Sequence, residues 1–81
     1  MPRDIDDLLE SLERLRSLQV LFGIDACDKM FDLACRLAAE SCGSVSYFIE
    51  GMIDGCLHGS GDWKAVYALY ESRLIFGGGE R

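Results

Sequence analysis

The chain has 81 residues, with 14 Asp or Glu against 8 Lys or Arg, which gives a formal net charge of −6. This acidity argues against direct nucleic-acid binding, because that function needs Lys and Arg to replace phosphate counterions. Apolar residues make up 49% and charged residues 27% of the chain, a globular rather than a disordered composition. We therefore expect a single folded domain over 1–81, which at this size buries only about 60% of its unfolded surface.

The opening residues and the longest apolar runs bear on localisation. The first residues, MPRDIDD, are acidic, whereas a secretory signal is basic and then apolar. No run approaches the roughly 18 apolar residues that suggest a membrane span. We expect a cytoplasmic protein that binds no membrane.

The first predicted helix spans 4–22, where apolar residues recur at helical spacing. Its heptad-like seam consists of Ile5, Leu8, Leu12, Leu15 and Phe22. Glu10 and Arg14, four residues apart, are expected to form an ion pair on the outer face. Arg16 lies at the edge of the apolar stripe, where its stem can cover apolar surface or anchor an interface. Gly23 is expected to end this helix with a left-handed cap.

The second predicted helix, 25–42, is divided lengthwise into a charged and an apolar side. The charged side carries Asp25, Asp28, Lys29, Asp32, Arg36 and Glu40. The opposite side carries Cys27, Met30, Phe31, Ala34, Leu37, Ala38 and Cys42. Because many residues on this side are small, we expect neighbouring helices to approach it closely.

The third predicted helix, 45–58, has apolar residues at intervals of three and four, a pattern that favours a helix over a strand. Ser44 is expected to cap it. Gly51, Gly55 and Gly59 recur every fourth residue, although a glycine in a helix interior costs about 1 kcal/mol. Either a close helix crossing or a groove for a partner's backbone would explain them, and we expect the crossing.

The fourth predicted helix, 62–76, begins at the capping residue Asp62 and is apolar almost all round. One apolar face consists of Trp63, Val66, Tyr67, Tyr70 and Leu74, and a second of Ala65, Leu69 and Phe76. Such a helix is either the middle of its bundle or shared with another chain. Because so small a protein has difficulty surrounding one helix, we expect a partner. Trp and Tyr are also enriched among interface hot spots.

Four helices joined by short loops predict an all-α fold. We expect a small antiparallel bundle made of two stacked helical hairpins, followed by a flexible tail at 77–81.

Residues 61–74 resemble the second helix of a tetratricopeptide repeat. Gly61, Asp62, Trp63, Tyr70 and Leu74 match that pattern, and Glu50, Asp54, Val66 and Arg73 depart from it. Stacked repeats of this kind need about three copies to be stable, whereas one hairpin is visible here. The resemblance is local and does not assign the chain to the family.

The four cysteines do not have the spacing of a metal site. On one helix, Cys27, Cys35 and Cys42 would be separated by about 12 and about 10 Å in rise, too far for one zinc ion. Cys56 and His58 would supply only two ligands. We expect these cysteines to be small core residues and expect no metal or other cofactor.

Catalytic groups are equally scarce. His58 is the single histidine, and its best helical neighbour is Asp54, with no nucleophile in the same group. We therefore expect no enzyme activity.

Two functions are favoured over a third class, an enzyme or metal protein, for which the residue inventory gives little support. The leading hypothesis is a non-catalytic interaction protein, such as a regulator, adaptor or chaperone, that binds a protein partner or forms a homo-oligomer. The residues expected to make that contact are Trp63, Tyr67, Leu69, Tyr70, Leu74 and Phe76. The alternative is an acidic inhibitor, of a phage or antitoxin type, that covers the basic nucleic-acid-binding surface of a target. Its surface would consist of Glu40, Glu50, Asp54 and Asp62, within a stretch, 37–62, that has no Lys or Arg.

Overall fold

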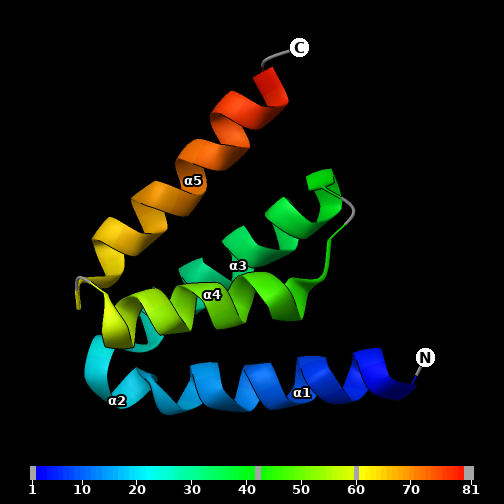
Figure 1. The fold of residues 1–81 in the computed structure, drawn as a ribbon. Helices are drawn as coiled ribbons and strands as arrows, with labels where there is room; N and C mark the ends of the chain where they lie inside the picture. Colours follow the sequence, from blue (N-terminus) through cyan, green and yellow to red (C-terminus); the bar gives the residue numbers. More distant parts are fainter. Residues whose placement is uncertain (1, 42, 60, 80–81) are drawn as a thin grey trace.

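The computed structural model describes residues 2–41, 43–59 and 61–79, and side chains from residue 5 to residue 74 within those ranges. The helices are α1 (Pro2–Ser17), α2 (Gln19–Phe22), α3 (Ile24–Ser41), α4 (Val45–His58) and α5 (Trp63–Gly79) (Figure 1). The described ranges contain no strand. The protein is an all-α bundle of four long helices with one additional short helical turn, as the sequence predicted.

The two middle helices are α3 and α4, which pack against each other. Helix α1 lies on one side of this pair and α5 on the other, and consecutive long helices run in opposite directions (Figure 1). The molecule measures 39 × 33 × 20 Å, and its thin dimension is close to the sum of two helix diameters. The bundle is therefore too thin to enclose α1 or α5, and each keeps an outward face.

The first helix differs from the prediction, because the single helix expected over 4–22 is interrupted at Leu18. The Leu18 amide bonds to the carbonyl of Leu15 at 3.0 Å, a tighter turn than that of an α-helix. The interruption coincides with the burial of Leu18 in the core, whereas Ile5, expected in the apolar seam, is exposed. Gly23 has the positive φ expected of it, 96°, but its ψ of 158° lies outside the left-handed helical region.

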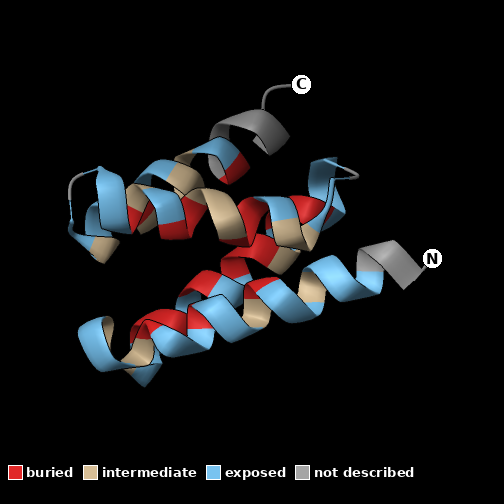
Figure 2. Cartoon of the chain, turned by 60° about the horizontal axis from the view of Figure 1, so that its bottom comes forward, coloured by how far each residue is buried: buried red, intermediate tan, exposed pale blue. Residues whose placement is uncertain are grey.

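The core is built mainly from α3 and α4, whose facing sides are the most deeply buried part of the chain (Figure 2). The large apolar side chains with the least exposure are Met30, Leu33, Ile49, Met52 and Ile53. Phe31, expected on the inner side of its helix, is instead 38% exposed at the edge, and Leu33 is buried. The apolar side of α3 is thus rotated slightly from the predicted one.

The caps predicted at Ser44 and Asp62 are confirmed. Ser44 accepts a hydrogen bond from the amide of Tyr47 at 3.2 Å, and Asp62 Oδ1 accepts one from the amide of Lys64 at 3.0 Å. Helix α5 continues to Gly79, through part of the tail expected at 77–81; residues 80–81 lie outside the described chain.

Candidate functional site

Helix α5 is packed on the bundle along one side. Val66 and Leu74 are buried, and Trp63, Tyr67 and Tyr70 are partly buried against the same core. The rings of Trp63 and Tyr67 meet edge to face, with centroids 6.3 Å apart. Four of the six residues predicted to bind a partner, all but Leu69 and Phe76, therefore contribute to holding α5 on its own chain.

Of the three spaced glycines, the two inside α4, Gly51 and Gly55, lie under α5, as the predicted helix crossing requires. A Cβ built on Gly51 would be 2.5 Å from the hydroxyl oxygen of Tyr70, and one on Gly55 would be 3.2 Å from a methyl group of Val66. The alternative, a groove that receives a partner's backbone at these glycines, is excluded because α5 occupies that place. Gly59 ends α4, and its Cβ would meet the carbonyl oxygen of Gly55.

The other side of α5 faces outward. Leu69 is 58% exposed, and Ala65 and Ala68 are exposed beside it. The side chain of Phe76, the remaining predicted contact residue, lies outside the described part of the structure. Helix α5 is thus an outer helix, and the suggestion that it forms the middle of the bundle is wrong.

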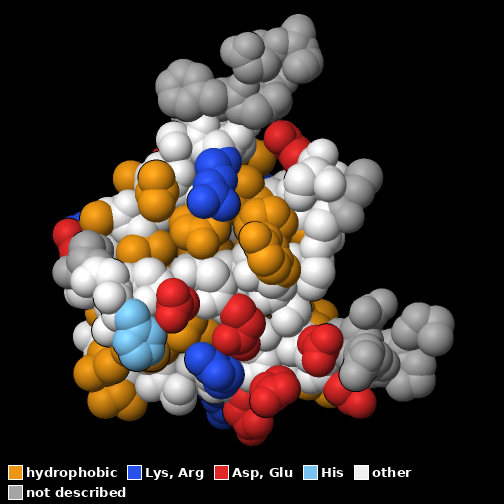
Figure 3. Space-filling view, viewed as in Figure 1, with side chains coloured by type: hydrophobic (Ala, Val, Ile, Leu, Met, Phe, Trp, Pro, Cys, Tyr) orange, Lys and Arg blue, Asp and Glu red, His pale blue; other side chains and the backbone are white. Residues whose placement is uncertain are grey.

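A groove of about 540 Å³ lies where the C-terminal half of α5 meets the end of α3 and the start of α4. Its lining consists of Leu37, Glu40, Ser41, Tyr47, Phe48, Arg73 and Leu74. On this side of the molecule, hydrophobic side chains gather over α4 and α5 next to a basic side chain (Figure 3). The volume lies within the range of roughly 300–1,000 Å³ that is usual for binding pockets.

The groove combines a buried floor with an exposed aromatic rim. Leu37, Phe48 and Leu74 are buried, whereas Tyr47 is 70% exposed. The Tyr47 ring stands edge-on to that of Phe48, at 5.2 Å between centroids and an interplanar angle of 79°. This contact holds an amphipathic ring at the groove's edge, a residue type that is frequent at interface hot spots.

Opposite charges stand among the residues that line the groove. Glu40 is exposed near the end of α3, and the guanidinium of Arg73 lies 4.5 Å from the centre of the Tyr70 ring. The cation–π contact restrains the Arg73 side chain while leaving its outward side open. The sequence did not indicate that Tyr47 and Arg73 line a groove, because neither belongs to the apolar repeat of its helix.

The four predicted acidic residues do not have equivalent surroundings. Glu40 and Asp54 are exposed, and Asp62 caps α5. Glu50 is only partly exposed and is bound by side chains of α1. The predicted acidic surface therefore loses the carboxylate of Glu50, which is engaged by α1.

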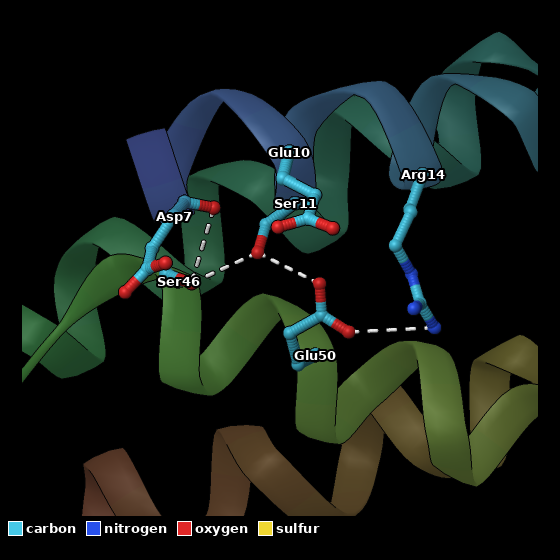
Figure 4. Close-up of a pocket in the computed structure, with 6 residues that line it drawn as sticks. All are labelled: Asp7, Glu10, Ser11, Arg14, Ser46 and Glu50. Carbon is cyan, nitrogen blue, oxygen red and sulfur yellow. Dashed lines mark hydrogen bonds and ion pairs between the residues drawn. The ribbon is translucent and has the colours of Figure 1, made fainter. Parts of the chain in front are cut away.

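Glu50 belongs to a polar cluster between α1 and α4, beside a pocket of about 290 Å³ (Figure 4). Ser11 is 1% exposed and donates a hydrogen bond to Glu50 Oε2 at 2.8 Å; the Ser46 hydroxyl oxygen is also 2.8 Å from that of Ser11. Arg14 forms an ion pair with Glu50 Oε1 at 3.4 Å. The predicted pair of Glu10 with Arg14 is wrong, because Arg14 reaches the neighbouring helix instead.

The described cysteines have the properties of core thiols. Burial raises the pKa of the thiols of Cys27, Cys35 and Cys56, and nearby negative charge adds to the rise. The Cys27 thiol donates a hydrogen bond to the carbonyl of Leu15 at 3.2 Å. A raised pKa lowers the thiolate fraction at neutral pH, which makes these groups poor nucleophiles.

Within the described part of the chain, no group of three or more Cys, His, Asp or Glu side chains is arranged to hold a metal ion. In the same part of the chain, none of the helices combines the length and the apolar character needed to cross a lipid bilayer.

Comparison with known proteins adds no relative. The chain matches no protein-family model, and no curated protein or solved structure matches it either. The likeness of residues 61–74 to a tetratricopeptide helix therefore stays a local likeness. Evidence on function comes from the surfaces of the chain itself, and the groove beside α5 is larger than the pocket beside Glu50.

Proposed function

We propose that the protein is a non-catalytic interaction protein that binds a helical segment of a partner protein in the groove beside α5. The observation that carries the proposal is the combination, in one open groove, of a buried apolar floor and the exposed ring of Tyr47. Grooves of this kind receive the apolar face of an amphipathic helix, with anchors spaced three and four residues apart.

The charges beside the groove suggest the orientation of the ligand. Glu40 comes from α3 and Arg73 from α5, so they belong to different walls. A bound helix that places an acidic residue near Arg73 and a basic residue near Glu40 would form an ion pair with each of them. Such pairs at an exposed rim set the register and the association rate more than the affinity.

We also propose a cytoplasmic location. The support for it is that Cys27, Cys35 and Cys56 are free thiols. Free thiols persist more readily in a reducing compartment than in an oxidising one. The acidic-inhibitor hypothesis is less favoured, because Arg14 already pairs with one of its four carboxylates, that of Glu50.

The proposal can be tested by replacing Tyr47 with a photo-crosslinking phenylalanine derivative in the full chain. Mass spectrometry of the adduct identifies the protein bound at the groove. Ser41→Trp in the same chain fills the groove from its rim, because Ser41 is exposed and lines it. We expect Ser41→Trp to abolish the adduct, and the identified segment, prepared as a peptide, to bind the wild type but not this variant.

A matched control places the same crosslinker at Leu57, an apolar residue of α4 that is exposed and does not line the groove. An adduct of equal yield at both positions would reject the groove as the binding site. Binding of the peptide unchanged by Ser41→Trp would reject it as well.

A further inference from the structure

Helix α1 is held to the bundle by less buried apolar surface than the other long helices. Among its described side chains, the buried ones are Ser11 and Leu15, and Ser11 is polar. Seven side chains of α3 and five of α4 are buried, and three aromatic side chains of α5 pack on the same core. Because apolar burial is the main favourable term in folding, α1 is the long helix that is attached least strongly.

The contact of α1 with α4 is polar in its middle and has open space beside it. Ser11 and Arg14 both bind the carboxylate of Glu50, and the Ser46 hydroxyl oxygen lies 3.4 Å from the carbonyl oxygen of Asp7 (Figure 4). A hollow of about 290 Å³ lies between α1 and α4, and one of about 220 Å³ between α1 and α3. Atoms that line a hollow lack contacts on one side, so α1 gains less dispersion energy on both flanks.

A short segment with little burial joins α1 to α3. The first helix is interrupted at Leu18, and α2, which follows, has no buried residue. Gly23 then has a φ of 96°, a conformation that glycine adopts without strain. Hinges are formed by a few residues at the ends of helices that absorb a change in backbone angles, and residues 19–23 have this position.

The end of α1 covers a thiol of α3. Cys27 is 3% exposed, and its thiol donates a hydrogen bond to the carbonyl of Leu15 at 3.2 Å. The same thiol lines the hollow between α1 and α3. Movement of α1 away from α3 would break this hydrogen bond and expose the thiol to solvent.

We propose that α1 opens from the bundle as one unit, turning at 19–23, and thereby uncovers Cys27 while α3, α4 and α5 stay packed together. The contacts of Ser11 and Arg14 with Glu50 determine how often α1 opens, because both are broken in the open form. Local opening of this kind is expected of an element with few buried apolar contacts. The groove beside α5 has no lining residue from α1, so this proposal and the proposed function can fail independently.

The first test is hydrogen exchange of the reduced full chain, measured for each amide by NMR and compared with the rates of an unfolded chain. Amides of α1 should be at least about tenfold less protected than the slowest amides of α3 and α4. Trp63→Ala separates local opening from complete unfolding, because Trp63 packs in the part of the bundle that stays closed. This variant should speed exchange of the slowest amides about tenfold or more and leave the exchange of α1 unchanged.

Glu50→Gln is the matched variant at the contact that opens. It removes the charge to which Ser11 and Arg14 bind and nearly preserves the shape of the side chain, so it should speed α1 exchange about tenfold. Unchanged α1 exchange in this variant would reject the role of the Glu50 contacts. Amides of α1 as protected as those of α3, or accelerated equally with them by Trp63→Ala, would overturn the proposal.

A disulfide staple tests the uncovering of Cys27. The hydroxyl oxygens of Ser11 and Ser46 are 2.8 Å apart, so Ser11→Cys combined with Ser46→Cys places two sulfurs within reach of a bond. Peptide mapping verifies the bond and circular dichroism the fold. The oxidised variant should react with N-ethylmaleimide at Cys27 about tenfold or more slowly than the same variant after reduction. Equal reactivity of Cys27 in the two forms would overturn the proposal.

Discussion

Gly51 of α4 lies directly beneath the hydroxyl group of Tyr70 on α5, so close that a Cβ at this position would be 2.5 Å from the hydroxyl oxygen. The absence of a side chain at Gly51 therefore sets how closely the second half of α5 approaches α4. Because the guanidinium of Arg73 lies over the same Tyr70 ring, the position of this ring also affects Arg73, which lines the groove.

Gly51→Ala should destabilise the protein by about 1 kcal/mol. The methyl group clashes with Tyr70, and overpacking of this kind costs about 1–3 kcal/mol, while replacing a helical glycine by alanine returns about 1 kcal/mol. Urea denaturation followed by circular dichroism measures the difference.

The Tyr70→Phe background provides the control for this substitution. Without the hydroxyl oxygen, the nearest ring atom is 3.4 Å from the position that the added methyl group would take, an ordinary contact. Gly51→Ala should then be neutral or stabilising by up to about 1 kcal/mol. Equal destabilisation in both backgrounds would show that the clash with the hydroxyl is not the cause.

Ser11→Ala should lower the free energy of unfolding by about 1 kcal/mol. Ser11 is buried and donates to Glu50 across the α1–α4 contact, and net hydrogen-bond contributions, larger toward charged acceptors, are of this order. Ser72→Ala is the matched control, because Ser72 also lies in a helix but bonds only to the carbonyl of Leu69 in its own helix. Chemical denaturation of both variants measures the difference, and equal effects would contradict a role of the cluster in joining the two helices.

Trp63→Ala should destabilise the fold by about 2 kcal/mol, because the indole is partly buried against the core and against Tyr67. Leu69→Ala, at an exposed position on the same helix, should change stability by less than about 0.5 kcal/mol. Thermal unfolding by circular dichroism compares the two variants. Equal stability of Trp63→Ala and the wild type would indicate that the indole does not hold α5 in place.

Alkaline pH should weaken the fold through the buried thiols. Burial raises the pKa of Cys56, with the charges of Cys27 and Asp62 adding to the rise, so the unfolded chain loses this proton first. The thiol's contribution is complete below its unfolded pKa of about 8.5 and is lost as the pH rises through the folded value. The free energy of unfolding should therefore fall above about pH 8.5.

Cys56→Ala should reduce this alkaline slope while lowering stability at neutral pH through the cavity it leaves. Urea denaturation at a series of pH values below about 10, where tyrosine begins to ionise, measures the slope. A slope identical to that of the wild type would exclude Cys56 as its source.

Much of the local structure was predictable because it depends on neighbouring residues along the chain. Ser44 and Asp62 cap their helices through amides two or three residues ahead, which is a contact within one turn. The glycine spacing of α4 indicated a close crossing, since only the lack of side chains on one flank explains such a costly repeat.

The interruption at Leu18, the exposure of Phe31 and the pairing of Arg14 with Glu50 were not predictable in the same way. Periodicity determines which residues share a side of one helix but not where the neighbouring helix lies. A rotation of α3 smaller than the angle between adjacent residues is enough to place Phe31 at the edge and Leu33 inside. Arg14 had two acids within reach, and only the packing of α1 on α4 selects between them.

The sequence by itself determined the helices, most of their ends and the apolar excess of the last helix, because these follow from the spacing and caps of nearby residues. Only the tertiary structure decided that α5 is an outer helix, that its aromatic side faces its own core, and that Tyr47 and Arg73 contribute to a groove. Those facts depend on how four helices share one thin core, since a residue's exposure is set by atoms distant in sequence.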